Sequence, residues 1–187
     1  MKKEKSKNQI RIFGSLRVMV LCSVFVAISI VCGKYLAIRG GDVLRFSFEN
    51  LPIILAGMAF GPVAGAAVGV VADLIGCILV GYAINPIITV AGALIGAIGG
   101  IMFRVCRKLP WWLCVTLTVT ACHAIGSVVV KTIGLAAFYS MPIWELMLWR
   151  LLNYVIIGVV EGVLIYILLK NKALRKQLLM YREEDVQ

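Results

Sequence analysis

The sequence predicts an all-α integral membrane bundle of six transmembrane helices with both termini in the cytoplasm, and three observations favour this fold. Hydrophobic residues make up 61% of the 187 residues, and the mean hydropathy is +0.98, far above the value of a soluble domain. Apolar runs long enough to cross a bilayer recur from Leu16 to Leu169. Five prolines divide this region into segments of suitable length.

The prolines indicate where helices begin, because residues in the first turn of a helix need no backbone N–H. The first helix precedes them. It is long and lacks a small-residue cleavage site, so we interpret it as a retained helix and not as a signal peptide. Gly61 and Pro62 are typical of one helix ending and the next beginning. Asn85 is a suitable cap for the fourth helix and Ser140 for the sixth. The expected spans are 16–37, 47–60, 62–81, 85–106, 110–137 and 142–170.

The second span is short for a membrane crossing, because Pro52 to Phe60 covers too little length at about 1.5 Å per residue. Either this helix begins near Phe46, with Pro52 inside its first turns, or the second and third helices form a re-entrant hairpin. The basic residues favour six crossings, because most of the 19 then lie on one side, as the positive-inside rule requires. They precede the first helix, follow the fourth or follow the sixth: Lys2, Lys3, Lys5, Lys7, Arg11, Arg17, Arg104, Arg107, Lys108, Lys170, Lys172, Arg175, Lys176 and Arg182.

We therefore expect a basic cytoplasmic segment over 1–15, a transmembrane domain over 16–170 and a cytoplasmic tail over 171–187. The net charge of +10 follows this topology and does not predict nucleic-acid binding. Six cysteines lie in or beside apolar helices without a CxxC pair, so they are interpreted as packing residues, and neither a metal site nor a cofactor is predicted. Glycines recur at four-residue spacing and predict close helix packing within the chain, with dimerisation as the alternative.

Five basic residues do not belong to the topology pattern: Lys34, Arg39, Arg45, Lys131 and Arg150. In the six-helix arrangement they lie outside the membrane or in its outer half. Polar and aromatic residues share that zone, namely Glu49, Tyr82, Asn85, Tyr139, Trp144, Glu145 and Asn153. Ionisable groups inside a membrane are costly and tend to mark pathways or ligand sites. The alternative for Lys34, Arg39 and Glu145 is an interfacial position, and for Asp73 and His123 a satisfied contact between helices.

Two stretches within this zone suggest a pocket. Arg150 and Asn153 lie three apart on one helix face, and Tyr154 adds an aromatic ring beside them. The segment RFSF, residues 45–48, alternates Arg45 and Ser47 with Phe46 and Phe48. Arginine binds both oxygens of a carboxylate, and aromatic rings stack on a flat conjugated ligand. The pattern predicts a ligand with a ring system and negative charge. Glu49 or Glu145 can accept hydrogen bonds from amino groups on that ring.

Catalytic motifs are missing from the sequence. It contains no phosphate-binding glycine loop, no HExxH and no GxSxG, so we do not expect an enzyme, and ATP hydrolysis by this chain is excluded as far as motifs reach. The first three helices do not repeat recognisably in the last three, which disfavours a secondary transporter built on inverted repeats.

The segment RFSFENLPIILAGMAFGPVAGAAVGVVADLIG, residues 45–76, resembles the signature region of the substrate-binding S components of energy-coupling-factor (ECF) vitamin transporters. Within that family it is most similar to the folate type. INPIIT (84–89) and WRLLNYVIIGVVEG (149–162) also fit, and the resemblance extends over about 16–169.

The resemblance implies six transmembrane helices that hold the vitamin at the outer side, under the loop between the first two helices. It also implies a multi-pass protein of a prokaryotic plasma membrane, part of an ABC-type importer with a membrane coupling subunit and two cytosolic ATPases. Family members meet the coupling subunit through small residues at four-residue spacing in the first helix. Here Ser23 and Ala27 supply that spacing, with serine replacing the first alanine, and Gly57, Gly61 and Gly65 let partner helices slide past.

The sequence thus predicts a high-affinity folate-binding subunit, with the RGGD loop at residues 39–42 closing over the ligand. The expected ligand-binding residues are Arg39, Arg45, Phe46, Phe48, Glu49, Tyr82, Asn85, Lys131, Tyr139, Trp144, Arg150, Asn153 and Tyr154. The alternatives are the same fold binding pantothenate, a flavin or a modified base, and, with less support, a membrane enzyme or a scaffold.

Overall fold

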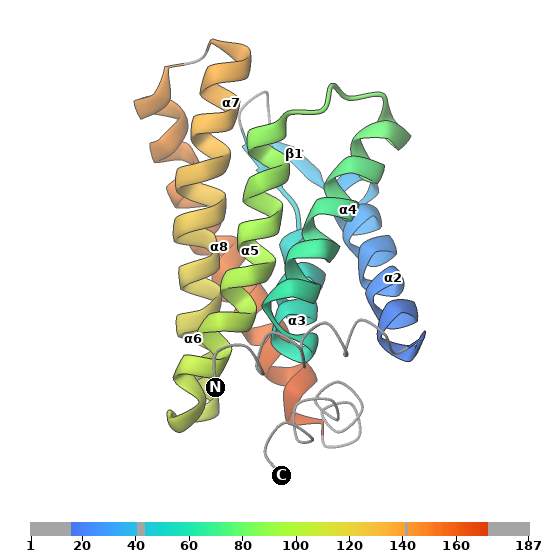
Figure 1. The fold of residues 1–187 in the computed structure, drawn as a ribbon. Helices are drawn as coiled ribbons and strands as arrows, with labels where there is room; N and C mark the ends of the chain where they lie inside the picture. The colour runs from blue at the N-terminus through green and yellow to red at the C-terminus, as the bar shows by residue number, and fades with distance from the viewer. Residues whose placement is uncertain (1–15, 41–43, 141, 172–187) are drawn as a thin grey trace, which may run out of the picture.

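The computed structural model describes residues 16–40, 44–140 and 142–171, and they form a helical bundle with one small β-hairpin at one end (Figure 1). Its helices are α2 (Leu16–Ile30), η1 (Val31–Tyr35), α3 (Asn50–Phe60), α4 (Pro62–Val80), α5 (Pro86–Val105), η2 (Cys106–Lys108), α6 (Trp111–Ala121), η3 (Cys122–Val130), α7 (Lys131–Tyr139) and α8 (Ile143–Lys170). Five of the resulting helical spans are long and apolar enough to cross a membrane, and α3 is a shorter apolar helix. The segments expected at 1–15 and 172–187 lie outside the described residues.

At two of the predicted places, helices begin and end at the glycine, proline and capping residues that the sequence indicated. Gly61 has φ of 97°, a conformation that glycine adopts without strain, and it separates α3 from α4, which begins at Pro62. The Asn85 side chain accepts a hydrogen bond from the backbone N–H of Ile87 at 3.0 Å and caps α5. These two predictions are confirmed.

The predicted cap at Ser140 is wrong. Ser140 has φ of 53° and ends α7, while α8 begins at Ile143 after Pro142. The left-handed conformation at Ser140 is that of a residue closing a helix C-terminus, and Pro142 has an extended backbone that starts the next helix.

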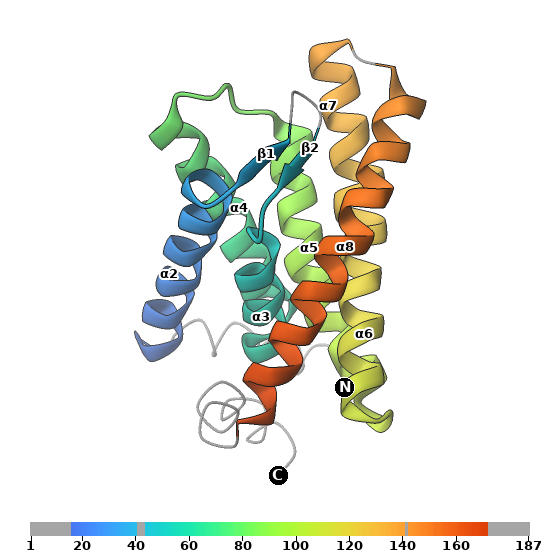
Figure 2. The ribbon, with the colours of Figure 1, turned by 180° about the vertical axis from the view of Figure 1, so that it is seen from behind.

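The second span begins later than expected, because the residues before it are extended. Strand β1 (Ile38–Gly40) pairs antiparallel with β2 (Leu44–Phe46), so that Arg39 lies opposite Arg45. The chain then descends into the bundle, and α3 starts at Asn50 with Pro52 in its first turn (Figure 2). The expected helix at 47–49 is therefore wrong. Since an extended residue advances about 3.3 Å against about 1.5 Å in a helix, this entry segment adds length to the second span for few residues.

The fifth span is continuous over α6, η3 and α7, but its middle is wound more widely than an α-helix. Cys122–Val130 forms nine residues of π-helix, a conformation that is rare and is often found at functional sites. His123 and Ser127 lie in this segment, and Lys131 follows directly after it. The four-residue spacing places these three side chains along one face.

Glycines allow α5 to pack backbone to backbone against α3 and α4. A Cβ atom on Gly96 would collide with the backbone of Gly65, and one on Gly69 would collide with the carbonyl of Gly92. Gly57 is equally tight against the backbone of Gly96. Such small-residue contacts take the place of the hydrophobic driving force that is missing between helices in lipid. The buried apolar core is centred on α3, with further members from α2, α4, α5, α6 and α8.

The outward surface is apolar over most of its height, as lipid contact requires. On α8, the side chains of Leu148, Val155 and Val159 are all more than half exposed. The start of α2 and the end of α8 both lie at the end opposite the hairpin (Figures 1 and 2). We call the other end, which carries β1 and β2, the hairpin end.

We expect Gly96→Ala to destabilise the bundle by about 1–3 kcal/mol, because its Cβ overlaps the backbone of α4. Gly162→Ala in α8 is the matched control, since nothing lies within 4 Å of the Cβ it would introduce. Thermal unfolding of the detergent-solubilised variants measures both. Equal melting temperatures for the two variants would show that this packing is not needed.

Candidate functional site

An ion pair between Lys131 and Glu49 lies in the half of the bundle nearer the hairpin. The Lys131 Nζ atom is 2.6 Å from Glu49 Oε1 and donates a second hydrogen bond to Asn50 Oδ1 at 3.2 Å. The two charged side chains are 9% and 23% exposed. Taking an ammonium ion out of water is costly unless an anion compensates it. The pair therefore fixes the start of α7 against the start of α3.

Arg150 approaches the same region from α8. Its Nε and Nη2 atoms donate to the carbonyl oxygen of Ser127 at 3.2 and 3.0 Å, and Nη2 donates to the Tyr154 hydroxyl at 3.4 Å. The guanidinium carbon lies 5.3 Å from the centre of the Tyr154 ring, within cation–π range. The imidazole of His123 also stacks on the Tyr154 ring, with 5.1 Å between the two ring centres. A planar cation and two rings thus form one layered group.

These contacts bring together several residues that the sequence predicted. Glu49, Lys131, Arg150 and Tyr154 converge through them, and Asn153 is buried on α8 beside Arg150. Phe46 and Phe48 are half-buried in the segment that leads from β2 to α3. Because β2 packs against α8, this segment lies near the group. The geometry places the two basic side chains, Lys131 and Arg150, near aromatic side chains.

Other predicted residues lie elsewhere or are only partly described. Asn85 is buried, caps α5 and donates to the carbonyl of Gly134 at 2.8 Å, which gives it a role in helix packing. Trp144 is 82% exposed on the outside of α8. Of Arg39, Arg45 and Tyr139 only the backbone is described, so the convergence of Arg45 with Arg150 stays a prediction.

A second polar cluster connects α4 with α5 and η1. Thr89 donates to Asp73 at 2.6 Å, and the thiol of Cys77 lies 3.8 Å from the same carboxylate. The Lys34 ammonium is 4.0 Å from the Cys77 sulfur and 5.4 Å from the centre of the Tyr82 ring. Asp73 is therefore in a contact between helices, the alternative that the sequence left open. Tyr82 belongs to this cluster through Lys34, and its part in ligand binding stays a prediction.

A small cavity of about 30 Å³ lies between the two clusters. Lys34 and Asp73 line it from one side, and Glu49 and Lys131 from the other. A volume of this size holds about one water molecule, and its four charged neighbours supply the partners that such a water needs.

Sequence reasoning missed three buried polar residues, Asn50, Ser127 and Glu161. Glu161 is fully buried in α8 and lies 2.8 Å from His123 Nε2, so His123 is also in a contact between helices. The signal for Glu161 was available, since it is a carboxylate inside the apolar run of the last helix. Asn50 and Ser127 offered none, because their burial depends on the entry segment and on the π-helix.

The sulfur and carboxylate groups of the described residues do not form a metal site. No three His, Cys, Asp or Glu side chains gather there in a way that could hold an ion. The six cysteines are all free thiols, and five of them are buried. Cys22, Cys106, Cys114 and Cys122 pack in the apolar core, as the sequence predicted, whereas Cys77 belongs to the polar cluster with Asp73 and Lys34.

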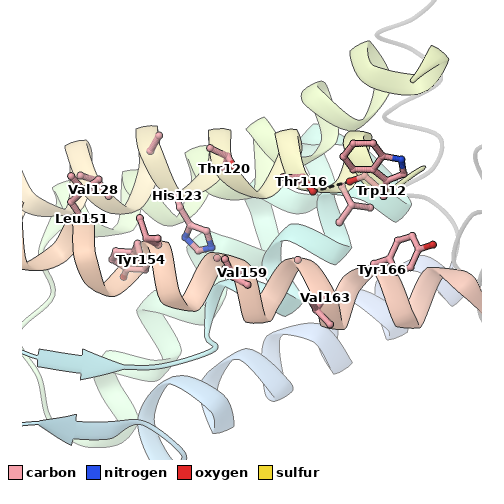
Figure 3. A pocket seen from close by; sticks show the side chains of 15 residues that line it. Trp112, Thr116, Thr120, His123, Val128, Leu151, Tyr154, Val159, Val163 and Tyr166 are labelled. Atoms are coloured by element: carbon pink, nitrogen blue, oxygen red, sulfur yellow. Dashed lines mark hydrogen bonds between the residues drawn. The ribbon is translucent and has the colours of Figure 1, made fainter. Parts of the chain in front are cut away.

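Two apolar grooves open on the outside of the bundle. The larger, about 480 Å³, runs between the α6–η3 segment and α8, with His123 and Tyr154 partway along it and Trp112 and Tyr166 at one end (Figure 3). The other, about 440 Å³, lies between α2 and α4 and is lined by Ser23 and Ala27.

The expected partner-binding glycines do not line that second groove. Gly57, Gly61 and Gly65 are buried within the chain, and Gly57 and Gly65 lie against the backbone of α5. These glycines contribute to internal packing, and their part in binding a partner stays a prediction.

Comparison with known proteins agrees with this architecture. The family described as "ECF transporter, substrate-specific component" matches residues 17–179. A comparison with curated proteins finds no match. The structure is similar to one titled "Crystal structure of FolT bound with folic acid", with a TM-score of 0.67 and 25% sequence identity over 81% of this chain and 92% of that chain.

The family match covers most of the chain and includes both the hairpin and the helices that carry the polar groups. This family is one of transporter components and not of enzymes. The chain belongs to the substrate-specific components of ECF transporters, multi-pass membrane proteins that bind a vitamin for uptake.

Proposed function

We propose that this protein binds folate, in its oxidised or reduced forms, at the hairpin end of the bundle and delivers it to an ECF-type ABC importer. The observation that carries the proposal is the layered group of Arg150, Tyr154 and His123 beside the Lys131–Glu49 pair. Folate has an anionic glutamate tail and a flat pteridine ring with amino groups. The cations suit the glutamate tail, and the aromatic rings and the Glu49 carboxylate suit the pteridine ring with its amino groups.

Arg150 has hydrogens left for such a ligand. Within the described part of the chain its contacts use Nε and Nη2, which leaves the two donors on Nη1 for a carboxylate. The Tyr154 ring below keeps the guanidinium plane in place, so little freedom is lost when a ligand binds. The similarity to a folic-acid-bound protein supports the same ligand class.

The hairpin end is proposed to be the extracytoplasmic side of a prokaryotic plasma membrane, with six segments crossing and both termini in the cytoplasm. The start of α2 and the end of α8 both lie at the opposite end, which supports an even number of crossings. Arg17, Arg104, Arg107 and Lys108 belong to helix ends or turns near that side, as the positive-inside rule favours. In this orientation the hairpin covers the entry to the ligand site.

The partners are proposed to be a membrane coupling subunit and two cytosolic ATPases, because the chain has no motif for ATP hydrolysis. The groove between α2 and α4 is the proposed docking face. Ser23 and Ala27 line it with small side chains, so a partner helix can approach closely there.

Isothermal titration of the purified protein against folate, pantothenate, riboflavin and a modified base tests the ligand class. We expect tight binding of folate alone, and loss of at least about tenfold in affinity for Arg150→Ala, because one carboxylate contact is removed. Arg107→Ala at the opposite end is the matched control and should bind as wild type does. The melting temperature of each variant reports whether the bundle remains folded.

Preferential binding of another vitamin would overturn the folate assignment. Unchanged folate affinity in well-folded Arg150→Ala protein would instead remove Arg150 from the site.

Ala27→Trp should abolish ATP-driven folate uptake in proteoliposomes with the coupling subunit and ATPases, because it fills the docking groove. Folate binding to the isolated protein should not change. Val24→Trp is the control, since Val24 is about half exposed on α2 but does not line the groove. Normal uptake by the Ala27 variant would place the docking face elsewhere.

A further inference from the structure

Five buried polar residues form a continuous chain of contacts from the hairpin half of the bundle into α8. Lys131 Nζ is 3.2 Å from Asn50 Oδ1, Asn50 Nδ2 is 3.3 Å from Ser127 Oγ, and Ser127 Oγ is 3.2 Å from His123 Nδ1. His123 Nε2 is then 2.8 Å from Glu161 Oε2. All five residues are less than 9% exposed. We call them the polar chain.

The lysine sets the direction at one end of the polar chain. An ammonium group has hydrogens to donate and no lone pair to accept, so the side-chain atom of Asn50 facing Lys131 is the oxygen. The amide nitrogen of Asn50 therefore faces Ser127, and it can only donate. Ser127 Oγ accepts this hydrogen bond.

The direction continues through the histidine. The Ser127 hydroxyl has one hydrogen, and within the described contacts its remaining side-chain partner is His123 Nδ1. A neutral ring with its hydrogen on Nε2 completes the row: Nδ1 accepts from the Ser127 hydroxyl, and Nε2–H is donated to the Glu161 carboxylate. With the opposite tautomer and an ionised Glu161, the Ser127 hydrogen would have no side-chain acceptor in the polar chain, and two lone pairs would face each other at Glu161.

We propose that Glu161 and His123 are positioning residues for the ligand site, acting through this one-way chain of donors. The polar chain runs from the Lys131 cation to the Glu161 anion, so each hydrogen bond polarises the next in the same direction. Glu161 is the final acceptor, and its presence orients Ser127 and Asn50 and thereby holds the Lys131 ammonium beside Glu49. This inference rests on the proposed function for its ligand and on the geometry for its direction.

The protein has a single histidine, so nitrogen NMR of histidine-labelled protein without ligand observes His123 alone. We expect a neutral ring with hydrogen on Nε2 and none on Nδ1 at neutral pH. A ring protonated on Nδ1, either as the other neutral tautomer or as the imidazolium, would overturn the proposed direction.

Two variants of similar side-chain length separate positioning from simple packing. Glu161→Gln keeps an oxygen that accepts from Nε2–H, and we expect the same tautomer and a folate affinity within about threefold of wild type. Glu161→Met removes the acceptor, and we expect the Nε2-protonated tautomer to lose its dominance and folate affinity to fall about tenfold or more.

The melting temperature serves as the structural readout, because a fall in folate affinity at an unchanged melting temperature separates positioning from a loss of the fold. Equal folate affinities for the Gln and Met variants would overturn the positioning role. If wild-type protein does not bind folate at all, the proposed function fails. The NMR result on wild type and on Glu161→Met then still decides whether the hydrogen bonds of the polar chain run from Lys131 to Glu161. If the Met variant does not fold, the wild-type ring state and the Gln variant decide it.

Discussion

The ion pair between Lys131 and Glu49 is the interaction on which the rest of this site depends. Lys131 starts α7, Glu49 precedes α3, and neither charge would be tolerated in an apolar bundle without the other. Because Glu49 also offers its backbone carbonyl to the hydroxyl of Ser29 at 2.7 Å, the pair holds the entry segment between α2 and α7. The hairpin is thus tied to the bundle at the point where the helical part of the second span begins.

Two features of the backbone make this arrangement possible. The glycine contacts bring α3, α4 and α5 so close that polar side chains at their ends reach across to other helices. The π-helical turns of η3 then direct His123, Ser127 and Lys131 toward α8 and α3. Arg150 donates to the carbonyl of Ser127 in this segment, so η3 offers α8 a backbone acceptor as well as side chains.

Much of the fold could be predicted from the sequence, and the failures have physical causes. Helix positions followed from apolar length and from proline and glycine, since lipid leaves the backbone few alternatives. The start of α3 was misplaced because Phe46 and Phe48 are equally apolar in a strand or in a helix, and only pairing with β1 decides between them. Ser140 was misassigned because serine suits several kinds of helix end.

The candidate site was predicted in part for the same reasons. Lys131 and Arg150 were singled out because charge is conspicuous in an apolar helix, and the spacing on the last helix placed Tyr154 beside Arg150. Asn85 and Tyr82 shared the outer zone in sequence, but the structure uses them to connect other helices. Asn50 and Ser127 became visible only in three dimensions, because their polar groups are satisfied by each other and by neighbours far away in the chain.

A double-mutant cycle on Lys131 and Glu49 tests the central claim most directly, with thermal unfolding and folate titration measured on the same samples. We predict that Lys131→Met and Glu49→Gln each cost stability, up to about 3–5 kcal/mol for an uncompensated buried charge, and that the double variant recovers much of this loss. The double variant should nevertheless bind folate far more weakly than wild type, because two of the charges proposed to meet the ligand are gone. Additive losses of stability, or wild-type affinity in the double variant, would contradict the account.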